Sequence, residues 1–268
     1  ENSWAAIELY GSEEIDHAVL RQAAAEVGQG SNTVMVQMAA QALQLPVEKI
    51  TLAAADTAIT QSAGSASASR MTFMSGNAIL GAAKEALKHW DAEERPAIGE
   101  YTYLAPKTSA FDPETGKSEP NFAYGYVAEA IESEVDLESG EVHVRNVICV
   151  DDVGKAVNPQ QVIGQVEGAI VQANGYGTIE NFIQKNGLAL TTKMSTYLIP
   201  TVLDVPDVVK TVLVENADPR GPFGVRGMGE MPYLPFVAAL AASVKDATGI
   251  WFNNFPLTAE KVWTELRK

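Results

Sequence analysis

The chain has 268 residues, with 19 Lys and Arg against 34 Asp and Glu, a formal net charge of −15 at pH 7. This balance argues against a nucleic-acid surface, because phosphate binding needs clustered basic side chains and none occur. The sequence contains no run of about 18 apolar residues, so it predicts no membrane span. The N-terminus has no basic flank followed by an apolar run and so predicts no secretory signal. We therefore expect a cytoplasmic protein. Cys149 is the single cysteine, which excludes a disulfide framework and a four-cysteine iron–sulfur or zinc site.

The chain alternates between strand and helix patterns, which indicates an α/β or α+β protein. Apolar residues recur at helical spacing in some stretches and gather in short runs in others. The predicted strands are residues 4–10, 18–22, 50–54, 122–135, 142–150, 188–192 and 208–214. A first helix is predicted after Asn32, with Met35, Met38, Ala39, Ala42 and Leu43 on one face and Pro46 as its stop. The other predicted helices are residues 72–90, 160–175 and 232–248, the last capped by Gly249.

The stretch from residue 91 to residue 121 has a different composition. It carries four prolines and two glycines, and no helix or strand pattern. We therefore predict two similar mixed α/β lobes, residues 1–100 and 122–268, joined by a crossing linker at residues 101–121.

Two glycine-rich segments of the first lobe could bind a ligand. Gly28-Gln29-Gly30 precedes a helix, whose first N–H groups and dipole favour polar or anionic groups. The alternative is a tight turn, and the G-x-G-x-x-G dinucleotide pattern fails at Thr33. The loop from Gly64 to Arg70 alternates small residues with hydroxyls and leaves its backbone uncovered. Its alternative is a flexible surface linker.

The second lobe offers a candidate catalytic group and a second flanked glutamine. Four glycines precede Glu230, which is followed by an apolar helix. A carboxylate that is poorly solvated beside methionines suits a general base. The alternative is a glutamate in the first turn of a helix. Gln165 lies between Gly164 and Gly168 at a helix start, so the two lobes present one such glutamine each.

Together these segments resemble a known family. The matching pieces, in register along nearly the whole chain, are Glu26–Gly30, Ser67–Arg70 with Gly76-Asn77-Ala78, Asp152–Lys155 with Asn158-Pro159, Gly164–Gly168, Gly227–Glu230 and Phe255–Thr258. The chain resembles the second molybdenum-binding domain of the xanthine dehydrogenase and aldehyde oxidase family of molybdenum hydroxylases.

The resemblance implies a cofactor and a site. The family holds molybdopterin, often as its cytosine dinucleotide, and inserts oxygen from water into an electron-poor carbon. Glu230 would be the catalytic base, and no protein side chain would ligate the metal. The cofactor-binding residues would be Gly28, Gln29, Gly30, Ala66, Ser67, Ala68, Ser69, Arg70, Gln165 and Gly229, with Ala68 beside the metal.

The resemblance also implies partners, since the family's full enzyme contains more than this chain. We expect the other half of the molybdenum subunit, an iron–sulfur subunit and an FAD subunit to lie on other chains or domains. Without them the chain would be inactive. The substrate would be an N-heteroaromatic such as nicotinate, a purine or xanthine. The alternatives are an aldehyde substrate, or a non-catalytic scaffold or cofactor-handling protein.

Overall fold

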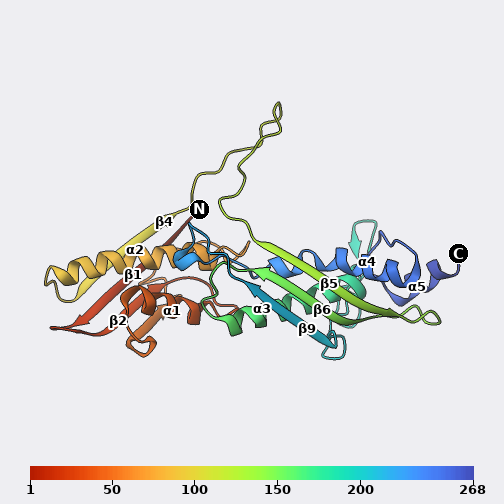
Figure 1. Cartoon of the computed structure of the whole chain (residues 1–268), viewed down its shortest axis with the longest axis horizontal. Helices are drawn as coiled ribbons and strands as arrows, with labels where there is room; N and C mark the ends of the chain where they lie inside the picture. The colour runs from red at the N-terminus through yellow and green to blue at the C-terminus, as the bar shows by residue number, and fades with distance from the viewer. The chain divides into compact units, whose positions relative to one another are not determined.

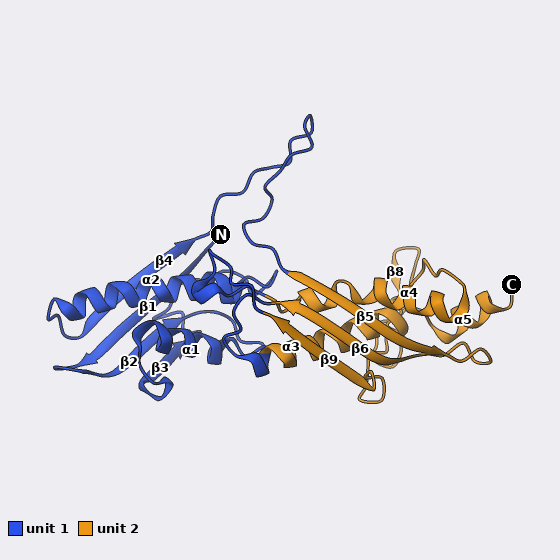
Figure 2. Cartoon of the chain, viewed as in Figure 1, with its two compact units in different colours: residues 1–125, 153–161, 215–227 blue, residues 126–152, 162–214, 228–268 orange.

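The computed structural model describes residues 1–268 and divides them into two compact units (Figure 1). Figure 2 shows unit 1, residues 1–125, 153–161 and 215–227, and unit 2, residues 126–152, 162–214 and 228–268. The sequence predicted one contiguous second lobe, whereas 153–161 and 215–227 group with unit 1. These two segments pair with each other, since the Arg226 N–H donates to the Val153 carbonyl over 3.0 Å.

Unit 1 is a four-stranded sheet with two helices against it. The sheet order is β3-β2-β1-β4, and only the β2–β3 pair is parallel. Its elements are β1 (Asn2–Gly11), β2 (Ile15–Gln22), α1 (Ser31–Leu43), the 3-10 turn η1 (Val47–Lys49), β3 (Ile50–Ala54), α2 (Met71–Asp91) and β4 (Ala97–Leu104). The predicted helix with Met35 to Leu43 on its apolar face is confirmed as α1, and the helix predicted over 72–90 is confirmed as α2 within a residue at each end.

The core of unit 1 lies between this sheet and its helices. Ile7 and Leu9 of β1 are fully buried with Met38 of α1 and Ile79 of α2. Helix α2 runs along β1 and β4 (Figure 1). Its approach to β4 depends on Gly99, where an added Cβ would lie 2.2 Å from a backbone nitrogen of α2. A larger residue there would push the helix off the sheet.

Strand β4 corrects the prediction of an irregular stretch over 91–121. Ala97 and Gly99 alternate with exposed neighbours and are buried against α2, and the strand pairs with β1 along its whole length. The prolines that suggested a linker lie outside the strand, Pro96 immediately before it. Residues 105–125, which follow, contain no helix or strand.

Unit 2 is built on a three-stranded sheet of order β5-β6-β9. Strands β5 and β6 form the predicted hairpin, and β9 lies parallel to β6. Its elements are β5 (Tyr126–Val135), β6 (Val142–Asp152), α3 (Pro159–Asn174, which begins in unit 1), the π-helical turn η2 (Gly175–Ile179), the short strands β7 (Gln184–Lys185) and β8 (Leu188–Ala189), β9 (Val208–Val214), α4 (Phe236–Thr248) and α5 (Ala259–Leu266).

The same element order occurs in both halves of the chain. A hairpin (β1–β2), a helix (α1), a parallel third strand (β3) and a second helix (α2) are matched by β5–β6, α3, β9 and α4. Parallel strands need a crossover connection, which each half supplies as a helix. The prediction of two similar mixed α/β lobes is confirmed at the level of topology.

Three details of unit 2 differ from the sequence prediction. The strand expected over 188–192 shrinks to β8, because it pairs only with β7. Helix α4 begins at Phe236 instead of residue 232, since Pro232 and Pro235 interrupt the preceding turn, but it ends at Gly249 as predicted. Helix α5 was missed, although Thr258 accepts a hydrogen bond from the Lys261 N–H as its N-cap. No helix in either unit is long and apolar enough to cross a membrane.

The sheet of unit 2 carries ionisable groups on a buried face. Glu129, Cys149 and Thr211 are neighbours across β5, β6 and β9, and Asp151 follows two residues after Cys149, hence on the same face. Asp151 is fully buried, and neither of its carboxylate oxygens has a hydrogen-bond partner. Burial raises the pKa of Asp151 to about 7, with a contribution from the charge of Asp152, and burial also raises the pKa of Glu129 to about 7.

This environment predicts an unusual dependence of stability on pH. Asp151 titrates near 3.8 when unfolded and near 7 when folded, so between these values the folded state holds the extra proton. The free energy of unfolding should therefore rise as the pH falls through 7 and decrease as the pH rises through it. Asp151→Asn should raise the free energy of unfolding at pH 8 by about 1–3 kcal/mol, because it removes a buried unpaired charge.

Urea denaturation at pH 8 and pH 5.5 measures this effect. Asp136→Asn is the control, because Asp136 lies in an exposed turn and accepts the Ser139 and Glu138 N–H groups, which lower its pKa. That control should not gain stability at pH 8. A less stable Asp151→Asn at pH 8 would contradict the prediction.

Candidate functional site

The predicted motifs follow the carboxyl ends of parallel strands. Strands β2 and β3 end at the paired residues Gln22 and Ala54, and β6 and β9 end at the paired residues Asp152 and Val214. In open α/β sheets this edge is where ligands bind, because the connecting loops gather there with helix N-termini. The loops after β2 and β3 carry Gln29 and Ala66–Arg70, and those after β6 and β9 lead to Gln165 and Glu230.

The loop before α1 is closed by its own side chains. Glu26 accepts hydrogen bonds from the backbone N–H groups of Gly28 (2.8 Å), Gly30 (2.9 Å) and Asn32 (3.0 Å). Partial burial acts to raise the pKa of Glu26, but these donors outweigh it and the pKa is lowered. Glu26 therefore occupies the helix N-terminus at which the sequence predicted a ligand.

Gln29 is engaged within the same loop. Its Oε1 accepts the Val27 N–H over 2.6 Å, and its Nε2 donates to the Ala25 carbonyl over 2.7 Å. Gly28 and Gly30 both have positive φ angles, 107° and 82°, which a tight turn here requires. In this structure the Gln29 amide therefore shapes the loop, and a bond from it to a cofactor would have to replace or share these contacts.

Arg70 also shapes its loop. The residue is 8% exposed, and its guanidinium donates to the carbonyls of Ala63 (3.0 Å), Ser65 (2.9 Å) and Asn2 (2.9 Å) and to the Glu1 carboxylate (3.1 Å). The family resemblance placed Arg70 among the cofactor-binding residues. All its nitrogens instead face oxygens of the chain, so its role here is to hold the loop backbone.

The remainder of this loop is presented outward. Ala66, Ser67 and Ala68 are exposed, and Ser69 is half-buried. Ala68 and Ser69 both adopt φ of 53°, in the left-handed region that residues with a Cβ rarely occupy. Such backbone persists only where neighbours enforce it and is frequent at binding sites. The outward, strained backbone is the feature of this loop that fits a ligand.

The loops of unit 1 contact one another. Gly154 and Val225 form an isolated antiparallel bridge. A Cβ added at Gly227 would lie 1.4 Å from the Ser69 carbonyl oxygen, and one at Gly30 would lie 2.7 Å from the Gln161 side chain. Segments far apart in sequence thus meet in one cluster, with Gly227 pressed against the strained Ala68–Ser69 backbone.

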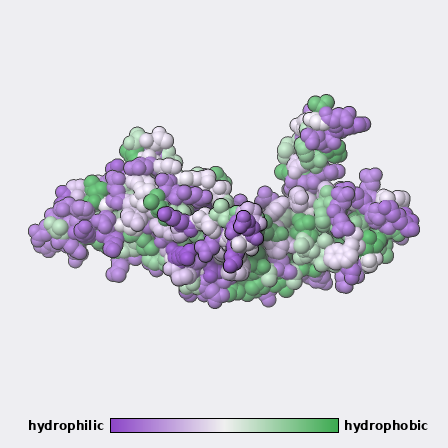
Figure 3. All heavy atoms as spheres, turned by 90° about the horizontal axis from the view of Figure 1, so that it is seen from above, coloured by the Kyte–Doolittle hydropathy of each residue, from purple (hydrophilic) through white to green (hydrophobic).

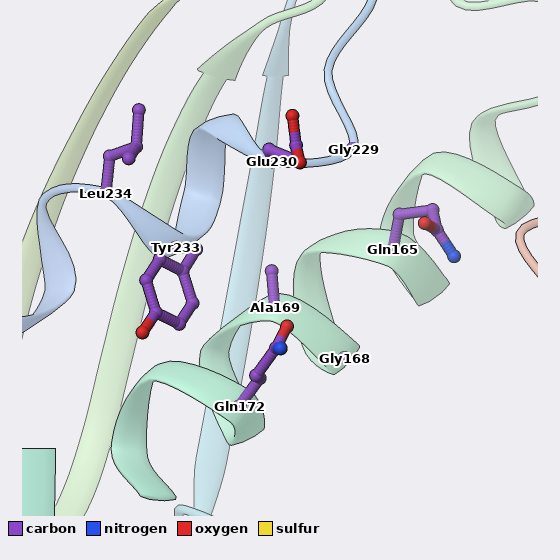
Figure 4. Close-up of a pocket in the computed structure, with 8 residues that line it drawn as sticks. All are labelled: Gln165, Gly168, Ala169, Gln172, Gly229, Glu230, Tyr233 and Leu234. Carbon is purple, nitrogen blue, oxygen red and sulfur yellow. The ribbon is translucent and has the colours of Figure 1, made fainter. Parts of the chain in front are cut away.

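Unit 2 contains a pocket of about 580 Å³ that brings together three predicted residues: Gln165, Gly229 and Glu230. One wall is a single face of α3, where lining residues recur at helical spacing, and the other is the segment leading to α4 (Figure 4). The lining residues are Gln165, Gly168, Ala169 and Gln172 from α3, and Gly229, Glu230, Tyr233 and Leu234 from the opposite segment.

Glu230 is held at the tip of a turn. The Met231 N–H donates to the Met228 carbonyl over 3.0 Å, and both methionines are 9% exposed, so they anchor the turn. Gly229 and Glu230 occupy its central positions, and Glu230 has φ −105° and ψ −10°, as the second central residue of a type I turn does. The prediction of a poorly solvated Glu230 is wrong for this chain, since the residue is exposed.

The helix wall of the pocket is built from small residues. At Gly168 an added Cβ would meet no atom within 4 Å, so no packing requires glycine there. Glycine inside a helix costs about 1 kcal/mol relative to alanine. Because Gly168 lines the pocket, its missing side chain leaves room there for another molecule. Gly164, one turn earlier, is equally open but does not line the pocket.

The other five lining residues were not predicted as site residues, although Gly168 lay in the Gly164–Gly168 motif: Gly168, Ala169, Gln172, Tyr233 and Leu234. Gln172 lies seven residues after Gln165, a spacing that places both on one helix face and could have revealed it. Tyr233 and Leu234 follow Glu230 within four residues, but only the 3-10 turn η4 (Met231–Tyr233) directs them to the pocket. Burial raises the pKa of Tyr233, with contributions from Tyr176 and Glu180, so its phenol stays a hydrogen-bond donor.

Comparison with known proteins agrees with this geometry. A family model described as a molybdopterin cofactor-binding domain matches residues 3–91 and 88–206. The chain is 30% identical to a probable xanthine dehydrogenase polypeptide of Bacillus subtilis, over 88% of this chain and 36% of the relative. It is 31% identical to an aldehyde oxidoreductase of Megalodesulfovibrio gigas, over 90% of this chain and 28% of the relative.

A solved structure extends the match to the fold. The aldehyde oxidoreductase of Desulfovibrio gigas superposes with a TM-score of 0.88 at 27% identity, covering 100% of this chain and 31% of that chain. The chain belongs to the molybdopterin-binding domains of the molybdenum hydroxylase family, which includes xanthine dehydrogenases and aldehyde oxidoreductases. It spans about a third of the length of these relatives.

The residues present fit a flat polar cofactor. The pocket offers the Gln165 amide beside Gly229, where an added Cβ would lie 3.7 Å from Gln165 Oε1, and the open space above Gly168. Unit 1, taken by itself, presents the exposed backbone of Ala66–Ala68. Neither unit contains a cluster of three or more His, Cys, Asp or Glu side chains that could hold a metal ion.

The two open glycines of α3 give a matched test of the pocket. Gly168→Ala and Gly164→Ala should each raise the free energy of unfolding by about 0.5–1 kcal/mol, because alanine favours the helix and neither Cβ clashes. Only Gly168→Ala should lower the molybdenum content of the assembled enzyme, since only that methyl group enters the pocket. Thermal unfolding and metal analysis measure the two effects. Equal molybdenum contents would contradict the assignment of the pocket.

Proposed function

We propose that this chain is the molybdopterin-binding part of a molybdenum hydroxylase that hydroxylates an N-heteroaromatic substrate of the nicotinate, purine or xanthine type. The observation that carries the proposal is the pocket that Glu230 lines together with Gln165 and Gly168. Bound there, the molybdenum cofactor would supply two-electron oxidation with oxygen derived from water.

Each pocket residue has a chemical role in this proposal. The Glu230 carboxylate accepts a proton during hydroxylation, as a general base. The Gln165 amide both donates and accepts, so it can hydrogen-bond the pterin and fix its orientation. Gly229 and Gly168 present no side chain and therefore let the cofactor approach the backbone on both walls.

The heteroaromatic substrate is favoured by the far end of the pocket. Tyr233 offers an aromatic ring and a protonated hydroxyl, and Gln172 offers an amide that can pair with a ring nitrogen or an exocyclic oxygen. A simple aldehyde has no ring to stack and one oxygen to recognise. An aldehyde is the second candidate, because one relative is named as an aldehyde oxidoreductase.

The proposal extends to the cofactor form and the partners. We propose the cytosine dinucleotide form of molybdopterin, with electrons passing to iron–sulfur and FAD groups on partner chains or domains. The existence of partner chains is supported by a relative named as the gamma subunit of the 6-hydroxypseudooxynicotine dehydrogenase complex of Paenarthrobacter nicotinovorans, at 27% identity. The cytoplasmic location stays a prediction.

Removing the base tests the reaction. Glu230→Gln keeps the size of the side chain but cannot accept the proton, so turnover should fall by about 10²–10⁴-fold. Molybdenum content should not change, because the carboxylate is not proposed as a cofactor ligand. Glu167→Gln is the control, since Glu167 is exposed on α3 and does not line the pocket. Half-normal activity in Glu230→Gln would contradict the assignment of Glu230 as the base. Assays of the assembled enzyme with nicotinate, xanthine and an aliphatic aldehyde separate the two substrate classes.

Removing either glutamine tests cofactor binding. Gln165→Ala should lower molybdenum occupancy by leaving about 1–3 kcal/mol of hydrogen bonding unmet. Gln29→Ala should also lower it, but with a loss of order in residues 26–32, because the Gln29 amide holds that loop. Metal analysis measures the molybdenum occupancy of both variants, and amide exchange detects the loss of order in residues 26–32 of Gln29→Ala. Normal occupancy in both variants would place these glutamines in plain structural roles.

A further inference from the structure

Unit 2 has a second exposed feature beside its pocket, an apolar surface formed by residues 182–205. Ten large hydrophobic residues of this segment are exposed. Leu203 is 86% exposed, Val202 85%, Leu188 70%, Met194 67% and Leu198 58%. Exposed apolar residues scattered over a surface need no explanation, but such a density within 24 residues indicates an interaction site. Figure 3 shows one face of the molecule, where apolar patches interrupt a mostly hydrophilic surface.

This segment is held in place although it has almost no regular secondary structure. The Tyr197 hydroxyl donates to Glu180 over 2.5 Å, and the Asn174 amide donates to the Asp204 carbonyl over 2.8 Å. Pro200 packs on Gly175, where an added Cβ would lie 2.3 Å from the proline Cγ. The backbone is thus fixed while its apolar side chains face outward, so their exposure is not the consequence of an unfastened loop.

The same anchors connect the apolar surface with the pocket. Asn174 ends α3, the helix that forms one pocket wall, and Gly175 begins η2. Tyr176 of η2 contacts Tyr233 of the other wall, with ring centroids 6.2 Å apart. Leu234, at the pocket edge, is 72% exposed. The apolar surface and the open side of the pocket therefore share supporting residues.

The low charge of the apolar surface limits the kinds of partner that can bind it. Residues 182–205 contain three charged residues, Lys185, Lys193 and Asp204, within a chain of net charge −15. A membrane with anionic lipids or a nucleic acid would require clustered basic side chains, which this surface lacks. A nearly uncharged apolar surface fits an apolar protein face.

Relatives indicate where such a face would come from. In the Desulfovibrio gigas structure the match takes in all of this chain but only 31% of that chain, so most of that polypeptide lies outside the matched part. We propose that residues 182–205 dock an apolar face of the molybdenum subunit that lies outside this chain. Docking covers Leu234 and the open side of the pocket and so removes water from Glu230. The choice of partner rests on the proposed function.

Amide hydrogen exchange tests the docking directly. In the assembled enzyme, residues 182–205 should exchange at least about tenfold more slowly than in the isolated 268-residue chain, because docking excludes water from them. Leu203→Asp should abolish that protection and lower the yield of assembled enzyme about tenfold or more. It should unfold at the same temperature as the parent chain, since the side chain is exposed.

Leu137→Asp is the matched control. Leu137 is 60% exposed at the turn between β5 and β6, outside the apolar surface, so this variant should assemble and protect residues 182–205 normally. Equal exchange of the segment in the assembled enzyme and the isolated chain would overturn the proposal. Protection that arises from self-association of the isolated chain, or from vesicles of phosphatidylcholine and phosphatidylglycerol, would also overturn it.

The molybdenum content separates this proposal from the proposed function. An assembled enzyme that protects residues 182–205 but holds no molybdenum would refute the function and retain the docking surface. An enzyme that holds molybdenum and loses it in Gln165→Ala, with residues 182–205 unprotected, would refute the docking surface and retain the function.

Discussion

The placement of the candidate loops within each unit depends on one parallel strand pair, β2–β3 in unit 1 and β6–β9 in unit 2. Parallel pairing forces each connection to cross the sheet, and it brings the loops that follow both strands to one edge. In unit 1 these loops are the one containing Gln29 and the one containing Ala66–Arg70. In the second half of the chain they lead to Gln165 and Glu230. Antiparallel pairing in either place would send one loop of each pair to the opposite edge.

The loops of unit 1 show how much of a binding motif serves the backbone. Glu26, Gln29 and Arg70 direct their polar atoms to main-chain groups, which costs less than leaving those groups unpaired. The Ala68–Ser69 backbone is held in the left-handed region by this scaffold and by Gly227 against Ser69. The side chains most typical of phosphate or amide recognition thus stabilise the loops, and the exposed backbone is what they present.

The pocket of unit 2 contains a carboxylate that could act as a general base, but its surroundings do not exclude water. Glu230 is placed by a turn anchored on two buried methionines, yet the carboxylate is exposed and Leu234 beside it is bare. A general base works best where water is excluded. The match of this chain to about a third of its relatives and the apolar surface over residues 182–205 lead to the same explanation. In the proposed function the pocket is therefore one side of a site, and the cover of that site lies outside this chain.

The sequence by itself determined the elements with local causes. Helix α1 followed from its periodicity and the end of α4 from Gly249, because spacing and capping act within a few residues. The glycine-flanked positions of Gln165 and Glu230 were also visible, and the structure brings both to one pocket.

Only the tertiary structure decided what depends on distant partners. Strand β4 exists because β1 pairs with it, although the surrounding prolines suggested a linker. Arg70 is structural because Asn2, almost seventy residues away in the chain, accepts its hydrogen bond. Glu230 is exposed because no part of this chain covers the turn that carries it, and residue type alone carries no information about that cover.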